Sequence, residues 1–338
     1  MKGIIVNKPF EIDIVDLEKP VIETEKEVLI KVKASGICGS DVHIYHGTNA
    51  VATYPRVLGH EIVGEVEEIG SGVTKFKKGD RVIIDQVMNC GKCYACKIGR
   101  GNVCKDLKVR GVHVHGGYRE YITADESSLY HIPEKLSYEE AIMIEPATIS
   151  VQCLSRAQVT KDDTVLILGA GALGSSILKV ARLSGAKLIV ADIFEEKLEE
   201  ARKLGAHHTI NMKAEDPLKE IRDITDGYGP TVSIDAACTK ETLPFLLEVT
   251  GNAGRVITMG FSEDLSPITQ LKITAKELDV RGSRLQNKKF QEVIDLVNEG
   301  KIDFEGSVSH SFNYNDVKDA LALIEKGDPS VRKIVLTF

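Results

Sequence analysis

Short apolar runs alternate with glycine-containing turns from Val28 to Asp85, and no long helical period interrupts them. The runs EVLIKVKA, IVGEVEEIG and RVIID are rich in β-branched residues and contain polar positions at intervals, which predicts strands. Short strands that follow one another through turns are typical of antiparallel sheets. The first part of the chain is therefore expected to form an antiparallel, strand-rich domain.

The pattern changes after Ser150. The apolar run TVLIL leads into a glycine-rich turn and the helical stretch SSILKVARLSG, followed by the strand LIVAD and the helix EEKLEEARKLG. The alternation continues through VSIDAA, ETLPFLLEV and RVITMG, and it fades near Arg281. Repeated β-α-β units predict an α/β domain with a doubly wound parallel sheet, covered by helices on both faces.

The tail contains two further helical segments, KKFQEVIDLVNEG and YNDVKDALALIEKG, and a closing strand, RKIVLTF. A terminal strand gains backbone partners if it pairs with the first domain, although the sequence alone does not show such pairing. We expect a first domain over residues 1–150 that is completed by residues 285–338, and a parallel α/β domain over residues 151–284.

Composition narrows the classes of function. A chain of 338 residues, of which 43% are hydrophobic, is long enough for two cores. The net charge of −7 is spread along the chain without a basic stripe, so nucleic acid is not expected as a partner. Residues 1–16 lack the apolar block of a signal peptide, and no run approaches the roughly 20 apolar residues of a membrane span. We expect a cytoplasmic protein without a membrane partner.

Four of the seven cysteines are crowded into fifteen residues: Cys90, Cys93, Cys96 and Cys104 form the pattern C-x2-C-x2-C-x7-C. Such a loop can direct four thiolates at one tetrahedral ion, which predicts zinc. An iron–sulfur cluster is the main alternative, but the last gap is seven rather than three and no proline follows Cys104. Four thiolates leave no open position, so this zinc is expected to be structural.

A second set of potential ligands is dispersed along the chain: Cys38, His60, Glu61 and Glu145. One thiolate, one imidazole and one carboxylate bind zinc and leave room for water or substrate, as a catalytic site requires. Each residue alone has an ordinary explanation, such as a core cysteine, a turn histidine or a helix-terminus carboxylate. Sequence spacing by itself does not bring them together.

A glycine-rich turn carries the dinucleotide fingerprint. Gly169, Gly171 and Gly174 follow a predicted strand and open a predicted helix, and Asp192 ends the next strand. The glycines allow the pyrophosphate to approach the helix N-terminus, and Asp192 can accept hydrogen bonds from ribose hydroxyls. Its charge repels a 2′-phosphate, so NAD is predicted in preference to NADP. A glycine-rich turn of another α/β fold is the alternative.

These motifs occur in the order found in a known family. The motif G-x-C-G-S-D at residues 36–41, the GHE at 59–61, the cysteine cluster and the later glycine-rich turn together resemble the zinc-containing medium-chain alcohol and polyol dehydrogenases. The resemblance covers essentially the whole chain. It implies a GroES-like β-barrel domain and a Rossmann domain, one catalytic and one structural zinc per chain, and a homodimer or homotetramer.

The resemblance also implies roles for single residues. Cys38, His60 and Glu61 are the expected ligands of the catalytic zinc, and Glu145 lies beside the metal, either as a ligand or as a hydrogen-bond partner of its water. Ser40 and His43 stand where similar enzymes place a hydroxyl and an imidazole that pass the substrate proton to solvent. For these two residues a simple turn position and a surface position are the alternatives.

The substrate is expected to be a small polyhydroxylated molecule. Among zinc dehydrogenases the sequence most resembles the bacterial group of L-galactonate and L-gulonate 5-dehydrogenases and RspB-like proteins, through the segments RGVHVHGGYREY and RGSR. A sugar acid needs a donor set for its carboxylate, which Arg110 or Arg284 could supply, although each could instead serve a structural ion pair. A sorbitol-like polyol, L-threonine as substrate, and a non-catalytic NAD-binding regulator remain alternatives.

Overall fold

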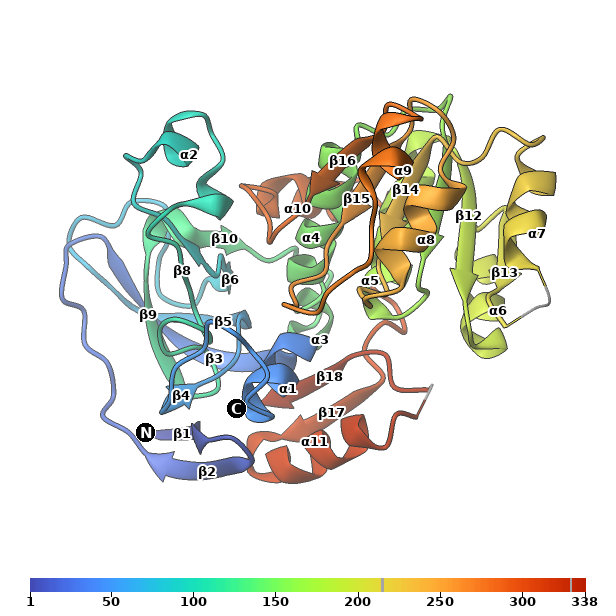
Figure 1. The fold of residues 1–338 in the computed structure, drawn as a ribbon. Helices are drawn as coiled ribbons and strands as arrows, with labels where there is room; N and C mark the ends of the chain where they lie inside the picture. Colours follow the sequence, from blue (N-terminus) through green and yellow to red (C-terminus); the bar gives the residue numbers. More distant parts are fainter. Residues whose placement is uncertain (214–215, 329) are drawn as a thin grey trace. The chain divides into compact units, whose positions relative to one another are not determined.

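The computed structural model describes residues 1–213, 216–328 and 330–338. The chain divides into two compact units (Figure 1). Unit 1 comprises Met1–Pro146 and Phe290–Phe338, and unit 2 comprises Ala147–Lys289. No helix in the described part of the chain is long and apolar enough to cross a lipid bilayer.

Unit 1 is built on a seven-stranded sheet in which six strands follow the order β10-β6-β5-β3-β18-β17 and β9 pairs with β3. All neighbouring strands are antiparallel except β17 and β18. A second sheet has the order β2-β1-β4, and β7 pairs with β8. The strands of this unit are β1 (Lys2–Lys8), β2 (Glu11–Asp16), β3 (Glu27–Ile37), β4 (Arg56–Val57), β5 (Glu61–Ile69), β6 (Arg81–Ile84), β7 (Val87–Met88), β8 (Lys108–Val109), β9 (Tyr121–Asp125), β10 (Leu129–His131), β17 (His310–Asn313) and β18 (Ile334–Thr337).

The long strand β3 organises this sheet. One of its edges pairs with β5 along most of its length, whereas the other pairs first with β9 and then with β18. Its alternate residues Val28, Ile30 and Val32 are completely buried in one core cluster with residues of β5, β6 and β9. Because successive side chains of a strand point to opposite faces, this alternation is the origin of the strand pattern in the sequence.

The C-terminal strand joins the N-terminal part of the chain, as expected. β18 pairs antiparallel with β3, with Ile334 opposite Ile37. The helices expected in the tail are present as α10 (Phe290–Asn298) and α11 (Val317–Glu325). Three short helices complete unit 1, namely α1 (Gly39–Tyr45), α2 (Tyr94–Lys97) and α3 (Tyr138–Ala141).

Unit 2 confirms the predicted doubly wound sheet. Six parallel strands have the order β13-β12-β11-β14-β15-β16. They are β11 (Thr164–Leu168), β12 (Lys187–Asp192), β13 (His208–Asn211), β14 (Val232–Asp235), β15 (Arg255–Thr258) and β16 (Asp279–Gly282). The associated helices are α4 (Ile144–Ala157), which begins in unit 1, α5 (Ala172–Ala181), α6 (Glu195–Lys203), α7 (Pro217–Ile224), α8 (Thr242–Val249) and α9 (Gln270–Thr274).

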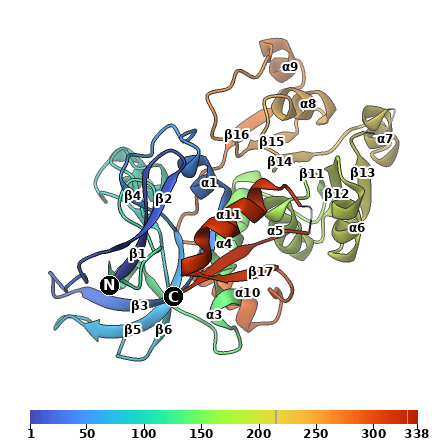
Figure 2. The same cartoon turned by 90° about the horizontal axis from the view of Figure 1, so that it is seen from below.

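The two faces of this sheet are covered by different helices. Val165 and Ile167 of β11 pack in one core cluster with residues of α4, α5 and α6, whereas Leu166 and Leu168 pack in another with residues of α7 and α8. Figure 2 shows the two groups of helices on opposite sides of the strands. Burial on both faces explains why β11 reads as the continuous apolar run TVLIL instead of an alternating pattern.

Candidate active site

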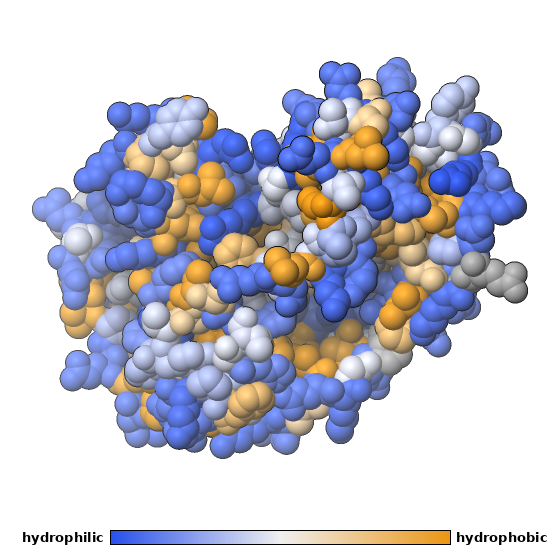
Figure 3. Space-filling model, in the orientation of Figure 1, coloured by the Kyte–Doolittle hydropathy of each residue, from blue (hydrophilic) through white to orange (hydrophobic). Residues whose placement is uncertain are grey.

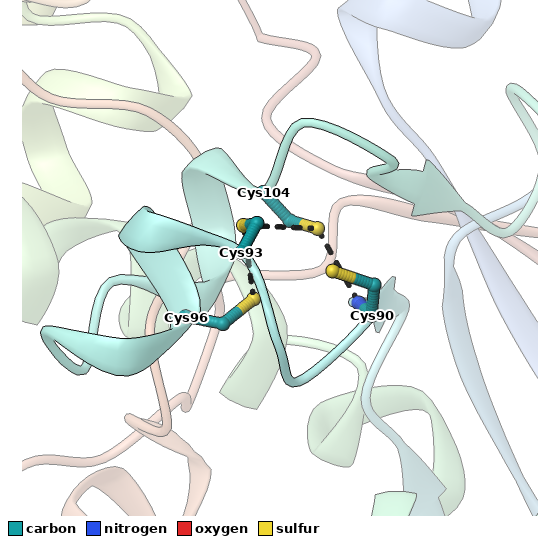
Figure 4. Close-up of side chains that lie close together, drawn as sticks. All are labelled: Cys90, Cys93, Cys96 and Cys104. Carbon is teal, nitrogen blue, oxygen red and sulfur yellow. Dashed lines mark hydrogen bonds between the residues drawn. The ribbon is translucent and has the colours of Figure 1, made fainter.

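The four clustered cysteines converge in a loop that contains α2 (Figure 4). One sulfur from each of Cys90, Cys93, Cys96 and Cys104 lies within 4.8 Å of all the others. The Sγ atom of Cys93 is 3.6 Å from that of Cys96 and 3.8 Å from that of Cys104. Backbone N–H groups at Cys90 and Asp106 donate to the Cys104 sulfur, each at 3.3 Å.

These spacings fit one tetrahedral ion. With metal–sulfur bonds of about 2.3 Å, a tetrahedral zinc holds its sulfurs about 3.8 Å apart. An iron–sulfur cluster with one iron per thiolate would hold the sulfurs farther apart, so the geometry favours a single ion. Backbone N–H groups of Cys96 and Lys105 lower the pKa of Cys93 to about 6, which favours the thiolate that binds metal.

The register of β3 and β5 brings the second ligand set together. Gly36 of β3 lies opposite Glu61, the first residue of β5. Cys38 follows β3 and precedes α1, and His60 immediately precedes β5, so both lie at the same end of the strand pair. Ligand atoms of Cys38, His60 and Glu61 lie within 4.8 Å of one another. We call these three residues the metal triad.

Two glycines make this close approach possible. A Cβ atom on Gly36 would lie 1.8 Å from the Oε2 atom of Glu61. Gly59 has a φ of 88°, and a Cβ atom there would lie 2.3 Å from the Tyr118 ring. A larger residue at either position would push the triad apart.

The charges around the triad favour a cation. Burial raises the pKa of Cys38, but nearby His60 and Lys333 outweigh this effect, so the pKa is lowered and the thiolate is favoured. Glu145 is buried at the start of α4 and accepts a hydrogen bond from the Gln86 amide. Burial and the negative charge of Glu61 raise the pKa of Glu145 to about 8. Glu145 thus lies near the triad but is not part of the group within 4.8 Å.

Asp41 contacts two residues of the metal triad, Cys38 and His60, a role that the sequence did not reveal. It is almost completely buried, and its Oδ2 atom accepts a hydrogen bond from the Cys38 backbone N–H at 2.9 Å. Its Oδ1 atom lies 3.5 Å from the Nδ1 atom of His60. A carboxylate behind a ligating histidine fixes the ring and its tautomer. The available signal was the position of Asp41 inside G-x-C-G-S-D.

Lys333 is the second residue that sequence reasoning missed. It immediately precedes β18, and its Nζ atom lies 2.6 and 2.8 Å from the two carboxylate oxygens of Glu61. Both side chains are buried, with 7% and 1% exposure. Only the pairing of β18 with β3 brings this lysine to the triad. A charged residue at the start of an otherwise apolar terminal strand was the one available signal.

The two predicted relay residues lie on α1. The Oγ atom of Ser40 is 3.5 Å from the Nε2 atom of His60. His43 is exposed, and its Nδ1 atom lies 2.9 Å from the Oγ1 atom of Thr48. Residues three apart share one side of a helix, so Ser40 and His43 are neighbours on α1. This places a hydroxyl near the triad and an imidazole near solvent.

The glycine-rich turn of unit 2 leaves room at a helix N-terminus. Gly169 has a φ of 103°, and a Cβ atom on Gly174 would lie 1.8 Å from the Gly169 carbonyl oxygen. At Gly171, the residue before α5, a Cβ atom would meet nothing within 4 Å. The first and third glycines are therefore required by packing, whereas the second leaves open space where a helix N-terminus attracts a phosphate.

Asp192 ends β12 beside this turn. Its carboxylate accepts hydrogen bonds from the backbone N–H groups of Ala170 at 2.7 Å and Phe194 at 3.0 Å. The Nζ atoms of Lys197 and Lys213 lie 4.9 and 5.0 Å from the centre of the Phe194 ring. These two lysines are cationic groups close to the residues that follow Asp192.

The two candidate substrate arginines differ in their surroundings. Arg110 of unit 1 is only 9% exposed, and its Nε–H has no acceptor among the residues that the structure describes. The guanidinium of Arg284, in unit 2, lies 4.6 Å from the centre of the Phe261 ring. Arg110 therefore has unused hydrogen-bonding capacity in a buried position, whereas Arg284 packs on an aromatic ring.

Comparisons with known proteins agree with this geometry. Residues 24–134 match the alcohol dehydrogenase GroES-like domain, and residues 172–299 match the zinc-binding dehydrogenase domain. The starvation-sensing protein RspB of Escherichia coli is 42% identical, over 100% of this chain and 99% of that protein. Sorbitol dehydrogenase of Bacillus subtilis is 35% identical, over 95% and 92% of the two chains. A crystal structure of rspB from E. coli CFT073 with NADH has a TM-score of 0.94 at 41% identity and covers 100% of this chain and 99% of its own.

Proposed function

Because the chain belongs to the zinc-binding alcohol dehydrogenases, we propose that it oxidises a secondary hydroxyl group of a sugar acid, of the L-galactonate or L-gulonate type, with NAD as hydride acceptor. The observation that carries the dehydrogenase reaction is the convergence of Cys38, His60 and Glu61 within 4.8 Å. A thiolate, an imidazole and a carboxylate leave one tetrahedral position for the substrate oxygen.

Each member of the triad has a distinct task in this proposal. Cys38, His60 and Glu61 hold the zinc, which when bound polarises the substrate hydroxyl as a Lewis acid. Lys333 orients the Glu61 carboxylate, and Asp41 orients the His60 ring. One thiolate and one carboxylate already neutralise a divalent ion, so a third anionic ligand would weaken its pull on the substrate. Glu145, with its raised pKa, is therefore expected to act beside the metal and to exchange with water.

Ser40 and His43 provide the path for the proton. The Ser40 hydroxyl would receive the proton from the substrate, and the imidazole of His43 would pass it to solvent. The exposed side chain of His43 suits the last position of this path, where the proton enters solvent. A protein that only bound NAD would have no use for this arrangement, which is why the regulatory alternative is less favoured.

Replacement of Asp192 by asparagine is expected to weaken NAD binding about 10- to 100-fold, because a charged acceptor of the ribose hydroxyls is lost. The same change removes the charge that repels a 2′-phosphate and leaves Lys197 and Lys213 nearby, so the relative use of NADP should rise. Initial rates with each cofactor measure both effects. Asp162→Asn, at an exposed position, is the matched control. An unchanged preference between the two cofactors would remove Asp192 from cofactor selection.

The sugar-acid substrate rests on different support from the dehydrogenase reaction. A carboxylate requires a cation that is not already paired, and Arg110 offers a buried Nε–H without an acceptor among the described residues. Relatives act on varied substrates: they include a D-arabitol-phosphate dehydrogenase at 33% identity and L-threonine 3-dehydrogenases at 33–34%. A polyol or L-threonine is the competing substrate class.

Steady-state reduction of NAD with L-galactonate, L-gulonate, sorbitol and L-threonine tests the substrate. We expect kcat/KM for a hexonate to exceed that for sorbitol by at least about tenfold, the value of one good charge-assisted hydrogen bond. Turnover of sorbitol or L-threonine alone would keep the mechanism and reject the sugar acid. Absence of turnover with every secondary alcohol in the set would favour a regulatory protein.

We further propose that the chain forms a homodimer or homotetramer. β16 is an edge strand of the parallel sheet, and large apolar side chains near it in the sequence are exposed, including Leu265 at 90% and Leu271 at 72%. Figure 3 shows hydrophobic surface over α9 and the segment before it. Exposed edges and apolar patches of this kind are typical of association surfaces. Sedimentation equilibrium measures the assembly directly.

A further inference from the structure

The segment from Arg110 to Arg119 contains two arginines with a hydrogen-bond donor that finds no acceptor in the described part of unit 1. The Nε–H groups of Arg110 and Arg119 are both inaccessible to solvent, and neither has an acceptor within the described part of the chain. Neither guanidinium belongs to an ion pair among those residues. Buried guanidinium groups are normally paired, because removing a charge from water costs several kcal/mol. Arg110 is buried and Arg119 is partly buried, so two guanidinium groups with unpaired donors in one segment need an explanation.

The positive charges of the two arginines also repel each other. Burial and the neighbouring charge of Arg110 lower the pKa of Arg119 to about 10. Arg56 adds a third Nε–H without an acceptor among the residues that the structure describes. Both Arg56 and Arg119 contribute, after burial, to the lowered pKa of His115. His115 accepts a hydrogen bond from the Val57 N–H at its Nδ1 atom, which leaves Nε2–H as a donor. The acidic groups that act on Arg110 are Asp85 and Glu27.

The segment from Arg110 to Arg119 packs directly against residues that position the metal triad. A Cβ atom on Gly111 would lie 2.8 Å from the backbone of Gly59, which immediately precedes His60. The Tyr118 hydroxyl lies 3.3 Å from the Oδ2 atom of Asp41. The backbone N–H of Arg110 donates to the carbonyl of Gln86, whose side chain donates to Glu145. The residues next to both arginines are thus fixed to the residues that position the triad.

We propose that Arg110 and Arg119 together form an anion subsite that binds the carboxylate or phosphate group of an extended polyhydroxylated substrate. The inference rests on the proposed dehydrogenase function, and it adds Arg119 as a second cation. Two guanidinium groups match the several acceptor lone pairs of a carboxylate or phosphate. Binding the anion would satisfy the donors of the buried Arg110 and the partly buried Arg119, and it would hold the rest of the substrate for oxidation at the triad.

The test measures binding without turnover, by isothermal titration of the zinc-loaded enzyme with NADH bound. The ligands are L-gulonate, sorbitol 6-phosphate and neutral sorbitol. Arg110→Met and Arg119→Met should each weaken L-gulonate binding about 10- to 100-fold, the effect of one hydrogen-bonded charge. Sorbitol binding should change less than about twofold. Lysine at either position should restore part of the affinity, because it keeps the charge but not the bidentate geometry.

The controls separate the possible outcomes. Arg100→Met, at an exposed position of the cysteine loop, should leave all three affinities unchanged. If the arginine variants weaken only sorbitol 6-phosphate, the anion subsite stands and the sugar-acid substrate is wrong. If neither anion loses affinity, or if the wild-type enzyme binds neither more tightly than sorbitol, the subsite is refuted.

Thermal unfolding without ligand gives an independent readout. Replacing one of two neighbouring like-charged groups should leave the melting temperature of the enzyme unchanged or raise it, because a repulsion is removed. L-gulonate should then stabilise the wild-type enzyme but not the methionine variants. A lowered melting temperature together with loss of sorbitol binding would indicate a packing role and overturn the proposal.

Discussion

His60→Ala should reduce the rate of NAD reduction by about 1000-fold or more. Polarisation of the substrate oxygen by a bound metal contributes several kcal/mol to catalysis, and about 4 kcal/mol corresponds to a factor of 1000. His60 supplies the only imidazole of the triad. Steady-state rates with the preferred substrate, together with the zinc content of the purified variant, measure the effect. We expect the variant to lose the catalytic zinc and retain the zinc of the cysteine cluster.

His131→Ala is the matched control, because His131 is an exposed residue of β10 outside the triad. Its turnover should stay within about twofold of wild type, as is usual for exposed positions. A His60→Ala enzyme that kept a tenth or more of the wild-type rate would show that the triad does not carry the reaction.

Lys333→Met should lower the free energy of unfolding by about 3–5 kcal/mol, because breaking a buried ion pair leaves one charge without compensation. The remaining charge is the Glu61 carboxylate, which is 1% exposed. Urea unfolding measures the loss. Saturating zinc should reduce it, since a cation beside Glu61 takes over part of the role of the lysine.

Two control variants test whether the loss of stability comes from the buried ion pair. Lys333→Arg keeps a cation near Glu61 and should lose less stability than the methionine variant. Lys318→Met removes an exposed lysine 3.9 Å from Asp13 and should change stability by less than about 1 kcal/mol. If Lys333→Met and Lys318→Met were equally stable, the buried ion pair would have no measurable role.

Local periodicity was sufficient to predict an antiparallel first half and a parallel α/β second half, and the family resemblance added the GroES-like barrel. The continuous apolar run of β11 reflects burial on both faces of the parallel sheet, and the short runs separated by turns in the first half reflect antiparallel strands, so the two halves could be distinguished. The four cysteines of the structural cluster lie within fifteen residues, so their convergence needed no knowledge of the fold. The C-terminal strand pairs with β3 of the first domain, which the sequence alone did not show.

The supports of the triad could not be predicted in the same way. Lys333 lies 272 residues from Glu61 along the chain, and only the pairing of β18 with β3 joins them. Asp41 was visible within a motif, but its role depends on its burial and on its distance from His60. Arg119 was quoted with Arg110 in one segment, yet burial without acceptors became apparent only in three dimensions. Long-range packing determines such properties, and residue spacing does not encode them.

The most direct test of the account follows NADH absorbance with L-gulonate while zinc is removed from the enzyme by a chelator and then returned. We predict that turnover disappears once the metal of the triad is lost, while circular dichroism still reports a folded chain, and that added zinc restores the rate. Turnover that continued in enzyme shown by elemental analysis to be free of zinc would contradict the assignment of Cys38, His60 and Glu61 as the catalytic metal site.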